Sequence, residues 1–363
     1  MKATYDEGFF TTLTKDGAYS VGVNADEAYK VSGTKDTDFL NGVTTLDLVI
    51  IQKYLLGLKS ITDAKLLLAA DINNNGEITA ADLLEARKVI LGTKERFTNN
   101  SWIAVDPQTN SRERAITVGT TNVSGIDFDA VKIGDMNKTA NALESRSSNS
   151  VRLMLDDANV KAGQIVEIPF YAEDFTGVYG AQFTMNLSGT LEELVSGGLD
   201  INESNYNVVN GNLIVSFNDA KGLDVADGRV LFTLKVRSDV DGNISNVLNI
   251  NDNVLRSEIY TGKDLEINSI EIGYRNVDVT YALYQNEPNP FVTTTTIGFE
   301  LPKAANYTLT VFDVTGRELK VLNSKGVAGY NSVTIDGISA TGVLTYRLKS
   351  DDFTATKKMV NLK

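Results

Sequence analysis

The chain has 363 residues, 42% of them hydrophobic, so it is long and apolar enough for about two to four domains with packed cores. Its net charge of -13 argues against nucleic-acid binding, because neutralising phosphates requires clustered lysine and arginine. The absence of cysteine and histidine excludes disulfides, thiol nucleophiles, Ser-His-Asp triads and histidine-ligated zinc or haem. No apolar run approaches the length of a membrane-spanning helix.

Residues 1–35 alternate weakly between apolar and polar side chains and predict about two or three strands, too few to bury a core alone. They resemble the trailing strands of a truncated upstream β-sandwich, similar to carboxypeptidase-regulatory-like modules. We therefore expect the natural protein to be longer. Polar residues follow Met1 in place of an apolar signal-peptide core, so we expect the signal peptide to lie outside this fragment.

Residues 36–97 contain one sequence twice. The stretch from Val43 to Gly57 returns from Ile78 to Gly92, and each copy follows a run rich in Asp, Asn and Gly. So tight a repeat predicts two copies of one loop-and-helix unit. Apolar residues recur in both helices at helical spacing and should face each other: Leu48, Ile51 and Leu55 in one helix, and Leu83, Ala86 and Ile90 in the other.

The second copy has the residue spacing of a calcium loop. Side-chain oxygens and one backbone carbonyl, that of Glu77, fall at loop positions 1, 3, 5, 7, 9 and 12: Asp71, Asn73, Asn75, Glu77, Thr79 and Asp82. Gly76 suits the left-handed turn at position 6. The Asp at position 12, the helix that leaves the loop directly and the duplicated pattern resemble dockerin domains. The alternative is an Asn/Gly turn that only caps a helix.

The first copy is a weaker loop. Its candidate ligands are Asp36, Asp38, Gly42, Thr44 and Asp47. Leu40 stands at position 5, where an oxygen is needed, and Asn41 stands where Gly is usual, although Asn tolerates a left-handed turn. We expect this loop either to bind calcium less tightly or to persist as a metal-free turn. The resemblance implies Ca²⁺ as the cofactor of the unit.

Dockerins commonly present polar residues at loop positions 10 and 11 to a partner. Here those positions are Thr45-Leu46 and Ala80-Ala81, a small and apolar surface that is costly to leave in water. We expect an intramolecular contact to cover it, with residues 102–137 the nearest candidate and the following sandwich the second. The alternative is an intermolecular contact that builds a polymer.

Residues 98–140 form a non-repetitive extension that, as in some relatives of the repeat, should pack back on the helices. Asp135 and Asn137 in it are either stray calcium ligands or part of a surface turn. Residues 141–150 are polar and predict a linker.

The hydrophobic period changes to two across residues 151–278. Val166, Ile168 and Phe170 form one of several alternating apolar faces separated by Gly-rich turns, which predicts a β-sandwich or jelly roll. The order of these signals is similar to a cohesin domain, the partner of dockerins. The alternative is an unrelated adhesin or carbohydrate-binding sandwich.

Residues 279–363 carry the most specific pattern. Leu283-Tyr-Gln-Asn-Glu-Pro-Asn-Pro-Phe291, Leu309 to Arg317, Gly342-Val343 and the terminal Lys357 to Lys363 follow one another in the order of a type A C-terminal sorting domain of Bacteroidota type IX secretion. Leu344 departs from that family, whose members tend to carry an aromatic residue there. The alternative is a small all-β domain without an export role.

This last resemblance implies a route and partners. The cargo would pass by Sec export through the periplasm, and residues 283–363 would engage the outer-membrane translocon, its shuttle protein and a surface sortase. Cleavage would fall between Tyr274 and Tyr281.

Taken together, the sequence predicts a mainly β, multi-domain chain: a small dockerin-like helix pair with calcium loops, a cohesin-like jelly roll and a small C-terminal β-sandwich. We expect the C-terminal region of a secreted, non-enzymatic adhesin or scaffold at the outer cell surface. The alternative is the non-catalytic tail of an extracellular glycosidase or protease whose catalytic domain lies upstream. Carboxylate pairs such as Glu192 with Glu193 carry no signal of catalysis.

Overall fold

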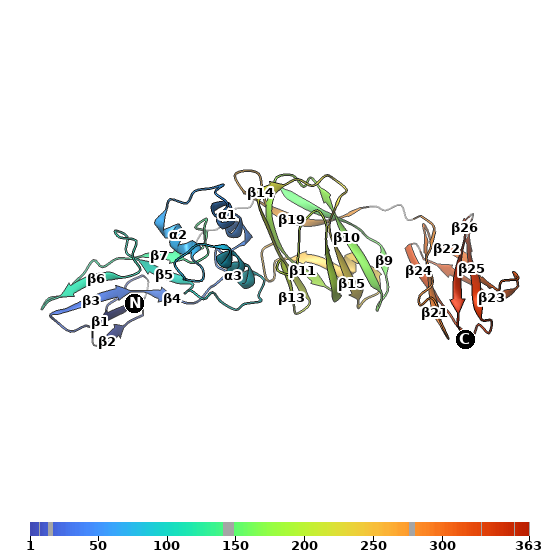
Figure 1. Ribbon diagram of the computed structural model, residues 1–363, viewed down its shortest axis with the longest axis horizontal. Helices are drawn as coiled ribbons and strands as arrows, with labels where there is room; N and C mark the ends of the chain where they lie inside the picture. The colour runs from blue at the N-terminus through green and yellow to red at the C-terminus, as the bar shows by residue number, and fades with distance from the viewer. Residues whose placement is uncertain are drawn as a thin grey trace.

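Strands are far more common than helices in the described residues, and a group of helices lies between two of the β regions (Figure 1). The computed structural model describes residues 1–6, 8–13, 17–140, 149–275, 280–327, 329–351 and 353–362. Most of the predicted linker, residues 141–150, lies outside them, as do residues 276–279 of the predicted cleavage region. Among the residues described, no helix has both the length and the apolar character needed to cross a bilayer.

Two small sheets join the start of the chain to residues 102–132. The first sheet has the order β2-β1-β3-β6 and contains β1 (Lys2–Tyr5), β2 (Gly8–Thr11), β3 (Glu27–Ser32) and β6 (Arg114–Val118). The second has the order β4-β5-β7 and contains β4 (Thr34–Lys35), β5 (Trp102–Val105) and β7 (Asp129–Lys132).

This pairing corrects the division that we expected at residue 35. Residues 1–35 were assigned to an upstream sandwich, yet β3 pairs with β6 and β4 pairs with β5. Tyr29 and Val31 of β3 are buried with Val118 of β6 in one small core. Alternation along a strand shows which face is apolar, but it carries no information about a partner that lies far along the chain.

The helical unit consists of α1 (Thr45–Leu55), α2 (Ala64–Ala70) and α3 (Ala80–Ile90). The two repeated helices begin in the same way. The Thr44 hydroxyl caps α1 and the Thr44 backbone N–H donates to the Asp47 carboxylate, and Thr79 and Asp82 form the same capping box at α3. The helix α2 was not predicted, because its seven residues are shorter than the window in which helical periodicity can be recognised.

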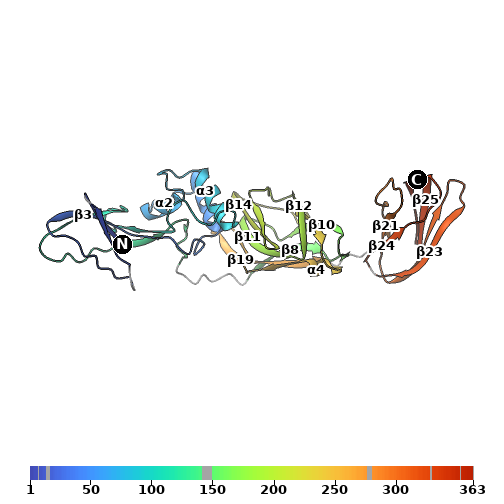
Figure 2. The same ribbon diagram turned by 90° about the horizontal axis from the view of Figure 1, so that it is seen from below.

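One core joins these helices to the extension. The predicted facing residues Leu48, Ile51, Ala86 and Ile90 are buried in it, with Val131, Ile133 and Met136 of the extension. The predicted packing of residues 98–140 against the helices is therefore seen in the structure. Figure 2 shows the helices between the N-terminal sheets and the following sandwich from a second direction.

The large sandwich is one long sheet folded on itself. Its strand order is β12-β15-β10-β8-β19-β18-β11-β14-β13, and β17 also pairs with β11. Its strands are β8 (Ser150–Asp156), β10 (Ile165–Glu173), β11 (Val178–Leu187), β12 (Gly189–Ser196), β13 (Tyr206–Val209), β14 (Asn212–Leu223), β15 (Val230–Ser238), β17 (Leu248–Asn251), β18 (Glu258–Thr261) and β19 (Glu266–Arg275). Two short strands, β9 (Asn159–Val160) and β16 (Gly242–Asn243), pair beside the helix α4 (Ile244–Val247).

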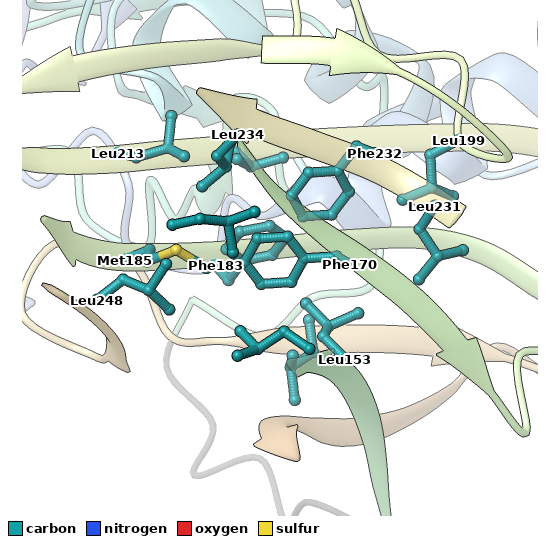
Figure 3. Close-up of a cluster of buried hydrophobic side chains, with 14 of the residues drawn as sticks. Leu153, Phe170, Phe183, Met185, Leu199, Leu213, Leu231, Phe232, Leu234 and Leu248 are labelled. Carbon is teal, nitrogen blue, oxygen red and sulfur yellow. The ribbon is translucent and has the colours of Figure 1, made fainter. Parts of the chain in front are cut away.

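All ladders of this large sheet are antiparallel except the pairing of β8 with β19. In the interior, Phe170, Phe183 and Phe232 point toward one another (Figure 3), and the ring centroids of Phe170 and Phe232 are 4.5 Å apart. The predicted face Val166, Ile168 and Phe170 is buried in this core. The prediction of a β-sandwich with alternating faces is confirmed.

The C-terminal part is a separate small sandwich with its own core, which includes Leu309, Leu344 and Tyr346. One layer is β20-β21-β24, formed by β20 (Ala282–Leu283), β21 (Thr295–Leu301) and β24 (Gly329–Ile335). The other layer is β23-β22-β25-β26, formed by β22 (Ala305–Phe312), β23 (Glu318–Gly326), β25 (Gly342–Ser350) and β26 (Phe353–Asn361).

Candidate functional site

The second predicted loop closes around its own aspartates. The carboxylate of Asp71 accepts hydrogen bonds from the N–H groups of Asn75 and Gly76, both at 3.0 Å. The carboxylate of Asp82 accepts from the N–H of Asn73 at 3.1 Å and from that of Thr79 at 2.9 Å. The loop thereby brings its first and last candidate ligands together.

The middle of this loop is also held locally. The side-chain oxygen of Asn75 accepts from the N–H of Glu77 at 2.9 Å, and Gly76 has a φ of 88°, as the left-handed turn requires. Asp82 is fully buried and Asp71 is 8% exposed. The six residues that the spacing predicted thus lie in one loop that offers carboxylate, amide and hydroxyl oxygens.

The structure does not assemble the first loop as predicted. Asp36 accepts hydrogen bonds from Arg96 and from the N–H of Ser101, and Asp38 pairs with Lys35 at 2.7 Å. Both carboxylates are therefore taken by cations or amides outside the loop. Local spacing alone could not show this, because Ser101 and Arg96 come from another part of the chain.

The other half of the first loop keeps its place. Asp47 is fully buried and its carboxylate accepts hydrogen bonds from the N–H groups of Thr44 and Met136, both at 2.7 Å. Burial raises the pKa of Asp47 to about 8, and the neighbouring carboxylate of Asp135 adds to the increase. Asp135, for which a surface turn was one expectation, is 5% exposed beside this helix start.

A lysine of the extension also lies here. The ammonium of Lys132 donates to the backbone carbonyl of Phe39 at 2.9 Å and to that of Ile133 at 3.3 Å. Burial lowers the pKa of Lys132 to about 8, against the opposing influence of Asp135 and Asp47. Its positive charge therefore acts on the carboxylates of Asp47 and Asp135 beside the first loop.

The first turn of α1 docks on the outer face of the sandwich. The N–H of Thr45 donates to the Gln182 side-chain carbonyl of β11, and its hydroxyl is hydrogen-bonded to the Ser216 hydroxyl of β14, both at 2.7 Å. The side-chain nitrogen of the same residue, Gln182 Nε2, donates to the backbone carbonyl of Arg256 at 3.1 Å. Thr45 is loop position 10 of the first copy, the position at which a contact was expected.

Further along, α1 lies over a glycine. A Cβ at Gly180 would be 3.0 Å from a methyl group of Val49, so the helix approaches the strand closely only because that side chain is absent. The amide of Asn218 donates to Gln52 at 2.7 Å, and the ammonium of Lys53 lies 3.7 Å from the centre of the Tyr179 ring.

Strand alternation explains why this face suits a helix. In β11 and β14 the residues that point into the sandwich are large and apolar, such as Phe183 and Val215. The residues between them point outward, and apart from the apolar Ile214 they are small or polar: Gly180, Gln182, Thr184 and Ser216. All three polar residues are nevertheless almost fully buried: Gln182 and Ser216 lie under Thr45 of α1, and Thr184 is hydrogen-bonded to Leu255 of the sandwich.

Apolar contacts continue the interface. Ile214, Leu255 and Tyr260 of the sandwich belong to the same hydrophobic core as the helices. The predicted contact surface at Thr45 and Leu46 is therefore covered by the sandwich and by this shared core, whereas Ala80 and Ala81 of the second copy stay exposed.

Three comparisons with known proteins bear on these parts. The family model described as the dockerin type I domain matches residues 35–91, which include both repeated helices. No curated protein matches the chain. The prediction of a mainly β, multi-domain chain with a dockerin-like helical region is confirmed.

Solved structures similar to this chain include cohesins. A type I cohesin–dockerin complex from Clostridium thermocellum gives a TM-score of 0.29 at 19% identity and covers 36% of this chain and 94% of that chain. A non-cellulosomal cohesin from Archaeoglobus fulgidus gives a TM-score of 0.27 at 19% identity and covers 35% and 91%. The third cohesin of ScaC from Acetivibrio cellulolyticus, in complex with a dockerin, gives 0.25 at 22% identity and covers 33% and 94%.

The docked helix generates a prediction at Gln182. Replacing it with leucine, Gln182→Leu, removes the acceptor of Thr45 N–H and the donor to Arg256, and each unsatisfied buried group costs about 1–3 kcal/mol. We expect a lower free energy of unfolding and faster hydrogen exchange of the Thr45 amide. The matched control is Gln108→Leu at an exposed position, which should change the free energy of unfolding by less than about 0.5 kcal/mol. Unchanged exchange at Thr45 in Gln182→Leu would contradict the docking.

Proposed function

We propose that this chain is the C-terminal region of a secreted modular protein at the cell surface, in which a calcium-stabilised dockerin-like unit is clamped to the adjoining sandwich of the same chain. The observation that carries the proposal is the buried pairing of Thr45 with Gln182 and Ser216. A helix start that is already covered in this way is not available to an external partner. The unit then acts as a rigid joint of a scaffold or adhesin.

The residues of the second loop fit calcium. They offer only oxygen ligands of mixed charge, which suits a hard cation, and the buried aspartates Asp71 and Asp82 bring two negative charges together. Within the described residues no three acidic side chains gather into a metal cluster, so amide, hydroxyl and carbonyl oxygens must complete the set. Bound calcium would supply charge compensation and hold the loop against α3.

The proposed role is non-catalytic. Glu167 and Glu193 are exposed strand residues, and Glu192 is paired with Arg237 at 2.9 Å, as solvated surface carboxylates are. The same arrangement would also serve as the tail of an extracellular hydrolase with its catalytic domain upstream. Both versions share the clamp, and they differ only in what precedes residue 1.

Export is the second part of the proposal. Residues 283–363 form a sandwich with a core of their own, and Leu344, where the sorting family tends to have an aromatic residue, is buried in it. A module that folds around its own core suits a sorting signal that the export machinery recognises and a sortase then cleaves off. We therefore propose type IX export in a bacterium of the Bacteroidota, with the translocon, shuttle protein and sortase as partners of this module.

The clamp predicts a monomer. Because the Thr45 surface is satisfied within the chain, the molar mass in solution should equal that of one chain at every concentration. Light scattering over a concentration series measures this. A mass that grows with concentration and collapses in Leu46→Asp would show that the contact forms between chains.

Calcium should stabilise the helical unit. Ligand binding to the folded state raises stability by about 2.7 kcal/mol at a calcium concentration 100 times the dissociation constant, so excess chelator should lower the melting temperature. Asp71→Ala should remove more of this effect than Asp36→Ala, because Asp36 is engaged with Arg96 and Ser101. A melting temperature that chelator leaves unchanged would refute calcium stabilisation.

Deletion of the C-terminal module tests its proposed role as the export signal. A chain that lacks residues 283–363, expressed with its natural upstream sequence, should accumulate in the periplasm. The control is a chain with Ala80→Ser at the exposed start of α3, which should reach the surface normally. Wild-type surface levels of the truncated chain would exclude a sorting role for this module.

A further inference from the structure

The extension completes the first loop. Residues 135–140 reach the start of α1, and they approach residues 42–47 most closely at Gly42. A Cβ at Gly42 would lie 2.4 Å from the backbone nitrogen of Ala140, and Gly42 has a φ of 70°. Only glycine allows the two segments to approach so closely.

Residues 135–140 repeat the two backbone hydrogen bonds that the first aspartate of the second loop accepts. The carboxylate of Asp135 accepts hydrogen bonds from the N–H of Thr139 at 3.0 Å and from that of Ala140 at 2.9 Å, four and five residues on. Asp71 accepts from the N–H groups four and five residues on at 3.0 Å. Position 4 is left-handed in both, with a φ of 65° at Lys138 and 60° at Asn74.

Residues 42–47 repeat the second half. The carboxylate of Asp47 accepts from the N–H of Thr44 and from Met136 in the opposing segment. In the second loop, Asp82 accepts from Thr79 and, across the loop, from Asn73, which lies at position 3 where Met136 lies at position 2. The contact of Ala140 with Gly42 falls where positions 6 and 7 are covalently joined in the second loop.

We propose that Asp135, Asn137 and Thr139 act with Gly42, Thr44 and Asp47 as a second calcium site, built from two separate segments of the chain. The proposal rests on the proposed function, since it assumes that the helical unit binds calcium. In this site Asp135, Asn137 and Thr139 take loop positions 1, 3 and 5. The backbone carbonyl of Gly42 takes position 7, Thr44 position 9 and Asp47 position 12.

Two independent observations point to a cation at this place. The dockerin type I match includes residues 42–47, so the second half of the site lies inside a calcium-binding family pattern. In addition, Asp47 is fully buried and Asp135 is 5% exposed, and a positive charge between two such neighbouring carboxylates stabilises their charged form, which burial otherwise disfavours. The ammonium of Lys132 is the competing source of that charge.

A calcium ion held in this way joins three parts of the molecule. One half of the site belongs to the extension, and the other half is the N-terminus of α1. The next residue after Thr44 is Thr45, which docks on Gln182 and Ser216 of the sandwich. The ion would therefore fix the extension to the same turn of α1 whose Thr45 is hydrogen-bonded to the sandwich.

The test uses matched asparagines at loop position 3 in the full chain. Asn137 and Asn73 are both half-exposed, so Asn137→Ala and Asn73→Ala should fold. Equilibrium dialysis with calcium should give two ions per wild-type chain. Each variant should weaken one of the two sites by about tenfold or more, because a ligand oxygen is lost, while Asp36→Ala should keep both affinities.

The outcomes separate this inference from the proposed function. Two sites of unchanged affinity in Asn137→Ala, or a lost site in Asp36→Ala, would overturn the split site. A single ion in the wild type would also overturn it and assign the compensating charge to Lys132, while calcium stabilisation through the second loop would stand. A wild type that binds no calcium would refute the proposed function itself.

Discussion

The burial of a polar sheet face under α1 is the constraint on which the rest of the structure depends. Gln182, Thr184 and Ser216 point away from the core of the sandwich, yet water does not reach them. Buried amides and hydroxyls are tolerated only when they are hydrogen-bonded, and Thr45 at the start of α1 supplies partners for two of them. Once α1 is fixed there, the shared apolar core places α3 and the extension against it.

The polar contacts at this interface also limit how the two parts can slide. A purely apolar helix could shift along a sheet at small cost, whereas a shift here would break the bonds of Thr45 and of Asn218 to Gln52 together. Gly180 adds a steric constraint, since it is the point of closest approach of Val49. Direction and register of the helix are therefore set by a few specific residues.

Local features of the chain could be predicted from sequence because their causes are local. The caps at Thr44 and Thr79, the turn at Gly76 and the alternating face ending at Phe170 depend on neighbouring residues only. Pairings between distant segments could not be predicted, and this explains both the misplaced first loop and the boundary at residue 35. Asp36 has suitable spacing, but Arg96 and Ser101 engage it.

The sequence nevertheless contains a further run of alternating oxygen-bearing residues outside the repeat. Asp135-x-Asn137-x-Thr139 has the same alternation of oxygen-bearing residues as Asp71-x-Asn73-x-Asn75. Asp135 and Asn137 were expected to be either stray calcium ligands or part of a surface turn, and they were not assigned to the first loop. The helix start that this segment contacts, at Thr45, lies 90 residues before Asp135, so a search for contiguous loops does not find the pair.

The one parallel pairing in the sandwich has a mechanical consequence. The first strand, β8, lies beside the last, β19, over the whole register from Ser150 with Ser269 to Asp156 with Arg275. The chain enters at one end of this ladder and leaves at the other, so tension along the molecule loads these hydrogen bonds in shear and all at once. A strand pair pulled in this direction cannot be opened one bond at a time. The sandwich therefore resists stretching between its first and last strands.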